Sequence, residues 1–174
     1  MDLAFAGDLT KVTTTPEYPL GTRCGIPASN MSKAAQYQTA DRGDSEWVYV
    51  YNDSGSDLVV GELIARKTAA GTYAVRQAPA NCPKPLLVGV CVKVIPDGYY
   101  GWVQCKGFVY GGVVSMNADF RDRGLFSGAV AGRAYLASAA VTDAERGPFG
   151  LGIVNNAAGA AGARIAAYID CPGA

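Results

Sequence analysis

A spacing of glycines that occurs twice is the feature that most constrains the fold of this chain. In each copy a glycine within an apolar run is followed nine residues later by a second glycine, and three residues after that by a third: Gly89, Gly98 and Gly101, then Gly150, Gly159 and Gly162. A further glycine precedes each copy, at Gly61 and at Gly132. Glycine permits tight turns and the close approach of two backbones. Because no reactive side chain repeats with the glycines, the pattern favours a repeated scaffold over a catalytic site.

The segments around these glycines have the composition of strands. Residues 47–51 alternate aromatic residues with valines, which is typical of a strand covered on both faces. Strands are also expected over 58–65, 72–77, 87–95, 99–109, 135–137 and 163–169. We therefore expect an all-β fold, a compact β-sandwich or β-barrel-like body of the β-tulip type, built from related strand-turn-strand units over 54–110 and 125–170. A helix over 129–140 is the alternative for one alanine-rich stretch.

The first 45 residues differ from the body, which is expected to span 46–174. The run Thr13-Thr14-Thr15-Pro16 is β-branched, ends in proline and shows little periodicity, so residues 1–45 are predicted to form an extended N-terminal arm. Residues 29–38 contain serine and asparagine as candidate N-caps before several alanines, which allows one short helix. Removal of the arm is expected to weaken attachment to a partner and to leave the β body folded.

Charge and length exclude several classes of protein. The 174 residues suit one compact body, and the 17% of charged residues falls well below the usual quarter, so much of the surface is expected to face neighbours. Lys plus Arg and Asp plus Glu number 15 each without a long run of either, which argues against nucleic-acid binding. No basic leader and no apolar stretch of 18 residues is present, so we expect synthesis in the cytoplasm and no membrane insertion.

The residue types offer little chemistry. The chain has no histidine, which removes Ser-His, Cys-His and His-metal arrangements. Five widely spaced cysteines predict neither a disulfide framework nor a zinc site. The acids gather in predicted turns, so a hydrolase with a carboxylate pair and a calcium loop are weak alternatives. The glycines do not match a phosphate-binding loop. We expect no catalytic residue, no cofactor and no metal.

The order of these motifs resembles a known family. It runs from Tyr18-Pro19-Leu20-Gly21-Thr22 through 47–50, Val60-Gly61-Glu62 and Val88-Gly89-Val90 to Gly98-Tyr99-Tyr100-Gly101-Trp102-Val103-Gln104. This succession is similar to that of capsid decoration, or cement, proteins of tailed bacteriophages. The resemblance covers roughly residues 18–169. It rests mainly on the positions of the turn glycines between the predicted strands.

The resemblance implies a structural virion protein on the outside of an icosahedral head. Its partner would be the major capsid protein, and copies would associate with one another, most simply as homotrimers. The expected contact residues are Tyr18, Leu20, Tyr99, Tyr100 and Trp102. Tyr18 and Leu20 are chosen because exposed apolar residues in an extended segment need a partner, and Trp102 because it is expected on the wetter side of the strand over 99–109, where it offers aromatic packing. The alternative is a head-fibre or tail-associated module that binds a receptor or glycan on a platform of Tyr99, Tyr100 and Trp102.

Overall fold

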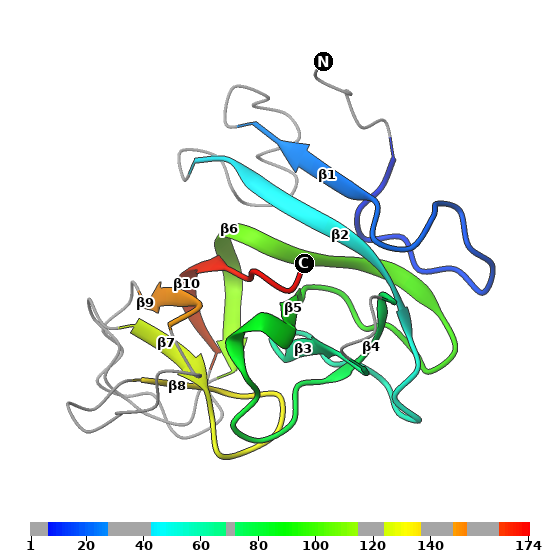
Figure 1. The fold of residues 1–174 in the computed structure, drawn as a ribbon. Coiled ribbons are helices and arrows are strands. Elements are labelled where there is room, and N and C mark those ends of the chain that lie inside the picture. The colour runs from blue at the N-terminus through cyan, green and yellow to red at the C-terminus, as the bar shows by residue number, and fades with distance from the viewer. Residues whose placement is uncertain (1–6, 28–42, 69–71, 115–123, 137–147, 153–163) are drawn as a thin grey trace.

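The fold is all-β around a closed five-stranded barrel, which confirms the expectation of a barrel-like body (Figure 1). The computed structural model describes residues 7–27, 43–68, 72–114, 124–136, 148–152 and 164–174. Within these ranges the elements are β1 (Arg23–Ile26), β2 (Ser45–Asn52), β3 (Leu63–Arg66), β4 (Ala74–Gln77), the 3-10 turn η1 (Lys84–Leu86), β5 (Leu87–Cys91), β6 (Tyr100–Val114), β7 (Gly124–Ser127), β8 (Ala134–Leu136), β9 (Gly150–Gly152) and β10 (Arg164–Asp170). The helix proposed over 29–38 lies outside the described residues.

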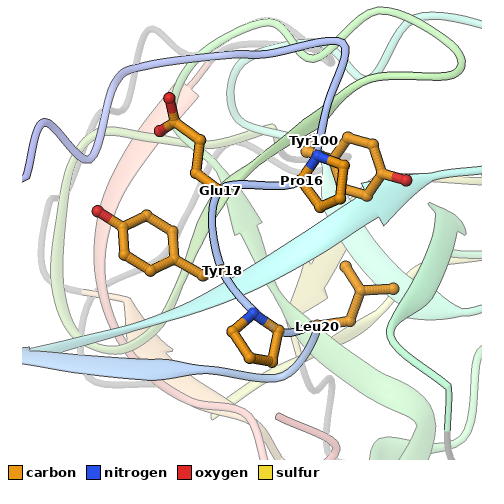
Figure 2. Close-up of a pocket in the computed structure, with 6 residues that line it drawn as sticks. Pro16, Glu17, Tyr18, Leu20 and Tyr100 are labelled. Atoms are coloured by element: carbon orange, nitrogen blue, oxygen red, sulfur yellow. The ribbon is translucent and has the colours of Figure 1, made fainter.

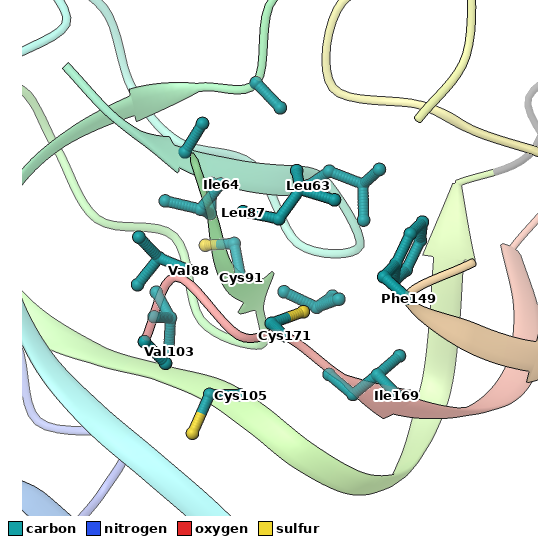
Figure 3. Close-up of a cluster of buried hydrophobic side chains, with 14 of the residues drawn as sticks. Leu63, Ile64, Leu87, Val88, Cys91, Val103, Cys105, Phe149, Ile169 and Cys171 are labelled. Atoms are coloured by element: carbon teal, nitrogen blue, oxygen red, sulfur yellow. The ribbon is translucent and has the colours of Figure 1, made fainter. Parts of the chain in front are cut away.

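The barrel closes because β2 pairs on both of its sides. The ring runs β2, β4, β3, β5, β6 and back to β2, and only the β2 to β4 pairing is parallel. Alternate residues of β2 face the barrel interior, where Val48 and Val50 join the main core. The same core takes in Leu63, Ile64, Val88, Val103 and the thiols of Cys91, Cys105 and Cys171 (Figure 3).

Strand β6 is long enough to belong to two parts of the sheet. Its first half pairs with β2 and β5 in the barrel, and its second half pairs with β10. Gly107 lies at this transition with φ of 96°, where an added Cβ would overlap the backbone of Asp44. Beyond β10 the sheet continues through β9 and β7 to β8. β6 continues through Gly111 and Gly112 to Val114, beyond the strand expected over 99–109.

The repeated glycines have matching structural roles. Gly61 and Gly132, with φ of 90° and 70°, occupy the same place in two turns. The first turn is closed by a hydrogen bond from Glu62 N to Val59 O of 3.1 Å, and the second by one from Arg133 N to Val130 O of 3.3 Å. Left-handed φ at the third position of such a turn is what glycine supplies.

Gly89 and Gly150 also correspond. Each lies in the first strand of an antiparallel pair, β5 with β6 and β9 with β10, and an added Cβ would overlap a carbonyl of the second strand. The repeat is local, because β3 pairs directly with β5 whereas β7 lies between β8 and β9. Gly159 and Gly162 lie outside the described residues.

Two predicted strands are shorter than expected from the sequence, and one helical alternative does not hold. The predicted strand over 58–65 begins only at Leu63, because 59–62 forms the turn. The predicted strand over 87–95 ends at Cys91, after which Ile95 makes an isolated bridge with Leu58. The described part of 129–140 forms a turn and β8, so the helical alternative does not hold there.

Candidate functional site

An aromatic face covers the outside of the barrel where β2 and β6 pair. We define it as Trp47, Tyr49, Tyr51, Tyr100 and Trp102. Tyr49 lies opposite Trp102 in the antiparallel register, and Tyr51 lies opposite Tyr100. The Tyr49 and Trp102 ring centroids are 5.1 Å apart, within the range of favourable aromatic contact. Because side chains alternate between the two faces of each strand, the valines point to the core and the aromatic residues point to the outer face.

Residues 7–22 cross this face as an N-terminal strap. Thr13 and Tyr100 exchange two backbone hydrogen bonds, of 3.0 Å from Thr13 N and 2.8 Å from Tyr100 N. Gly21 N donates to Tyr49 O at 2.9 Å, and Tyr49 N donates to Thr22 O at 2.9 Å. Leu9 is only 1% exposed and packs in one cluster with Trp47, Tyr49 and Trp102. The described part of the predicted arm therefore lies against its own body.

Tyr18 and the Tyr49 hydroxyl fix the centre of the strap. The Tyr18 ring stands edge-on to both Tyr49 and Trp102, at centroid distances of 5.3 and 5.4 Å. The Tyr49 hydroxyl accepts a hydrogen bond of 3.1 Å from Glu17 N and lies 3.4 Å from the Thr13 hydroxyl. A single buried tyrosine therefore joins two separate points of the strap to the barrel.

An open hollow remains beside the strap. It has a volume of about 460 Å³ and is lined by Pro16, Glu17, Tyr18, Pro19, Leu20 and Tyr100 (Figure 2). Leu20 is 39% exposed there. Glu17 forms an ion pair with Lys11, and this hydrogen-bonded carboxylate raises the pKa of Lys11. The ion pair thus offsets the charge of Glu17 at the rim, and the lining combines apolar and polar surface.

The structure separates the five predicted contact residues. Tyr18, Leu20 and Tyr100 come together at the hollow. Trp102 was expected on the wetter side of its strand, and this was wrong, because it is 2% exposed beneath the strap. Tyr99 and Tyr100 are half-buried on opposite faces, with Tyr99 against the main core and Tyr100 against the aromatic cluster. No stacking platform of Tyr99, Tyr100 and Trp102 is formed.

Two residues that fix the site, Tyr49 and Leu9, were not singled out from the sequence. The alternation over 47–51 already placed Tyr49 on an aromatic face, although it could not show what covers that face. Leu9 carries no such signal, because it stands alone in an irregular segment. Its role depends on the path of the strap, which is set by contacts with β2 and β6.

The thiols and carboxylates have structural surroundings. All five cysteines are free and buried. Burial raises the pKa of the Cys91 and Cys105 thiols to about 12 and that of Cys82 to about 11, so they remain protonated near neutral pH. Among the described residues, no group of three or more acids or cysteines is placed to hold a metal ion. Asp53 and Glu46 instead pair at the surface with Lys67 and Lys106.

Comparison of the chain with protein-family models, with curated proteins and with solved structures gave no match. Of the helical segments within the described ranges, none has the length and apolar character needed to span a membrane.

Proposed function

We propose that this chain is a non-enzymatic structural protein that binds the outside of an icosahedral phage head and joins neighbouring major capsid subunits. The observation that carries the proposal is the N-terminal strap, which is held on the barrel at several points and displays Pro16, Pro19 and Leu20 beside Tyr100. Apolar and aromatic surface with little net charge is typical of the centre of protein interfaces. The motif order described above, which resembles that of capsid decoration proteins, supports a major capsid protein as the partner.

The body is suited to such a role on physical grounds. Packed DNA strains the junctions between capsid subunits, so a protein that joins them must resist deformation. A closed barrel has no free edge within its ring, and its strands are connected through backbone hydrogen bonds on both sides. The strap adds a second, aromatic layer outside the barrel. Association of three copies at threefold positions of the head is part of the proposal.

The hollow also favours a second candidate function. Tyrosine rings, proline rings and a carboxylate are groups that contact sugar rings in binding sites, so a receptor or glycan-binding module remains the alternative. Its platform would be Tyr18 with Tyr100, since Trp102 is covered. A glycan array separates the two functions. Binding that is lost in Tyr100→Ala, with no affinity for heads, favours the module.

The proposal is tested with phage heads prepared with and without this chain. We expect purified protein to co-sediment with heads that lack it and to raise the temperature at which they release DNA, because a ligand that binds only the intact shell stabilises it. Leu20→Asp should weaken co-sedimentation at least about tenfold, since a charge would be buried in the contact. Val130→Asp, at an equally exposed valine, is the matched control and should bind normally. Heads that neither bind the protein nor gain heat resistance contradict the proposal.

A further inference from the structure

Two exposed valines, Val59 and Val94, lie next to the bridge between Leu58 and Ile95. Leu58 and Ile95 exchange hydrogen bonds of 3.0 and 3.1 Å as an isolated antiparallel bridge. Beyond an antiparallel bridge the next residue of one segment lies beside the preceding residue of the other, so Val59 and Val94 flank this bridge on the same side. Leu58 and Ile95 are fully buried, whereas Val59 and Val94 are 45% and 40% exposed. The two valines therefore form one small apolar patch facing solvent.

The charges on either side of this patch are of opposite sign. Lys93 precedes Val94 at one end, and Asp57 and Asp97 lie at the other end, beyond the Leu58 and Ile95 pair. All three side chains are exposed, and none forms an ion pair with another residue in the described ranges. The nearby carboxylates accept hydrogen bonds from uncharged groups only: Glu62 from Val59 N and Gln77 Nε2, Asp97 from Gly55 N at 2.8 Å, and Asp57 from Asp97 N at 3.4 Å. The patch therefore has a positive end and a negative end.

A surface with this order of groups is complementary to itself. A twofold axis through the valines sets the valines of two copies against each other and brings Lys93 of each copy to Asp57 and Asp97 of the other. A patch of one sign would repel its own copy, and a patch without charge would not fix the direction of contact. We propose that the valine patch, defined as Val59 and Val94 with Lys93, Asp57 and Asp97, is a twofold contact between two copies of this chain.

This contact does not depend on the proposed function. It uses a different surface from the hollow beside the strap, and a twofold pair differs in mass from a threefold trimer. In a decorated shell it would link copies that belong to neighbouring threefold positions. In solution two valines per copy make a small interface, so we expect a weak and reversible dimer, within the range of small transient contacts.

Sedimentation equilibrium of the full chain up to about 1 mM tests the contact. The average mass should rise with concentration from 18.0 kDa toward twice that value. Val59→Ser with Val94→Ser should weaken association at least about tenfold, because the apolar centre of the contact is lost. Val130→Ser, at an equally exposed valine outside the patch, is the matched control and should associate normally. A chain that stays monomeric throughout, or a dimer insensitive to the valine changes, overturns the proposal.

A charge exchange provides a second test that a folding defect cannot imitate. Lys93→Asp makes both ends of the patch negative. Asp57→Lys with Asp97→Asn makes the other end positive, and the asparagine keeps an oxygen for the hydrogen bond that Asp97 accepts from Gly55 N at 2.8 Å. Each variant alone should stay monomeric, and an equimolar mixture should form a heterodimer at 50 mM salt that weakens at 500 mM. Failure of the mixture to associate, with both variants folded by circular dichroism, contradicts the twofold arrangement.

Discussion

The Tyr18 ring meets the indole of Trp102 edge-on, with the two ring centroids 5.4 Å apart. Tyr18 belongs to the irregular N-terminal strap and Trp102 to the long strand β6, so this contact joins the strap to the barrel. It changes the roles of both residues. Trp102 stabilises the fold from beneath the strap, and Tyr18 is half-buried between two aromatic neighbours. The strap is consequently expected to behave as part of the folded body.

Leu9→Ala tests whether the strap contributes to stability. Removing this buried side chain should lower the free energy of unfolding by about 2 to 4 kcal/mol, because the substitution leaves a cavity beside Trp47 and Tyr49. Urea denaturation measures the change. Leu20→Ala is the matched control, and we expect a change within about 0.5 kcal/mol at that exposed position. Equal effects of the two substitutions would show that the strap is not packed on the barrel in solution.

Tyr49→Phe removes the hydroxyl that holds the strap. The backbone N–H of Glu17 then loses its partner at 3.1 Å, which should cost about 1 kcal/mol in the free energy of unfolding. Hydrogen exchange at the Glu17 amide should accelerate, since the strap opens more often there. Tyr51→Phe is the control, because its hydroxyl makes no hydrogen bond with another described residue. An unchanged exchange rate at Glu17 in Tyr49→Phe would contradict this assignment.

The repeated glycines give a third prediction. Gly89→Ala and Gly150→Ala should each destabilise the fold by about 3 kcal/mol or more, because the new methyl group overlaps a carbonyl of the adjacent strand and the backbones must separate. Gly25→Ala is the control, since a Cβ there meets no atom within 4 Å. Thermal unfolding compares the three variants. A benign Gly150→Ala would show that the second copy of the pattern does not share the role of the first.

The buried thiols should be unreactive in the folded protein. All five cysteines are buried and free, and burial keeps the Cys91 and Cys105 thiols protonated. Because the thiolate is the reactive form, we expect almost no labelling by a thiol reagent at pH 8 in native buffer. Five groups should be labelled in denaturant. Rapid labelling of any thiol without denaturant would contradict the packing described for it.

The same burial predicts a loss of stability in alkaline solution. The folded-state pKa of Cys91 is raised to about 12 from the ordinary 9.0, so the unfolded chain releases this proton first. The contribution of the Cys91 thiol to the free energy of unfolding is complete below pH 9. It is lost as pH rises from 9 toward 12, and the free energy of unfolding then falls by up to about 1.4 kcal/mol per pH unit. The Cys91→Ala variant has no thiol at this position and therefore lacks this pH-dependent contribution. The difference in unfolding free energy between wild type and variant should therefore shrink across that interval, and a constant difference would contradict it.

Local features of the fold, such as strand alternation, are easier to predict from the sequence than long-range contacts are. The alternation over 47–51 is a property of a few neighbouring residues and was predicted. The positive φ values of Gly61 and Gly132 were not predicted, and Gly61 lies in a turn within a segment expected to be a strand. Barrel closure depends on β2 pairing with β4 as well as β6, and no short pattern encodes that choice.

The burial of Trp102 depends on contacts that are distant in sequence. The alternation along β6 was read correctly as two faces, but the outer face was assigned to solvent. Residues 7–22 cover it, and their path is set by Tyr49 and Tyr100 far along the chain. Tyr18 and Leu20 could be chosen from the sequence because they are apolar residues in a proline-rich segment. Their meeting with Tyr100 in one hollow could not.

Cryo-electron microscopy of intact heads tests the central proposal most directly. If the proposal holds, a phage encodes this chain, and its heads would be compared with heads from a strain in which the chain is deleted. The account predicts density on the outer surface of the capsid in the first sample, with a barrel and strap that fit it, and loss of that density in the second. Identical capsid surfaces in the two samples, or density found only on the tail, would contradict it.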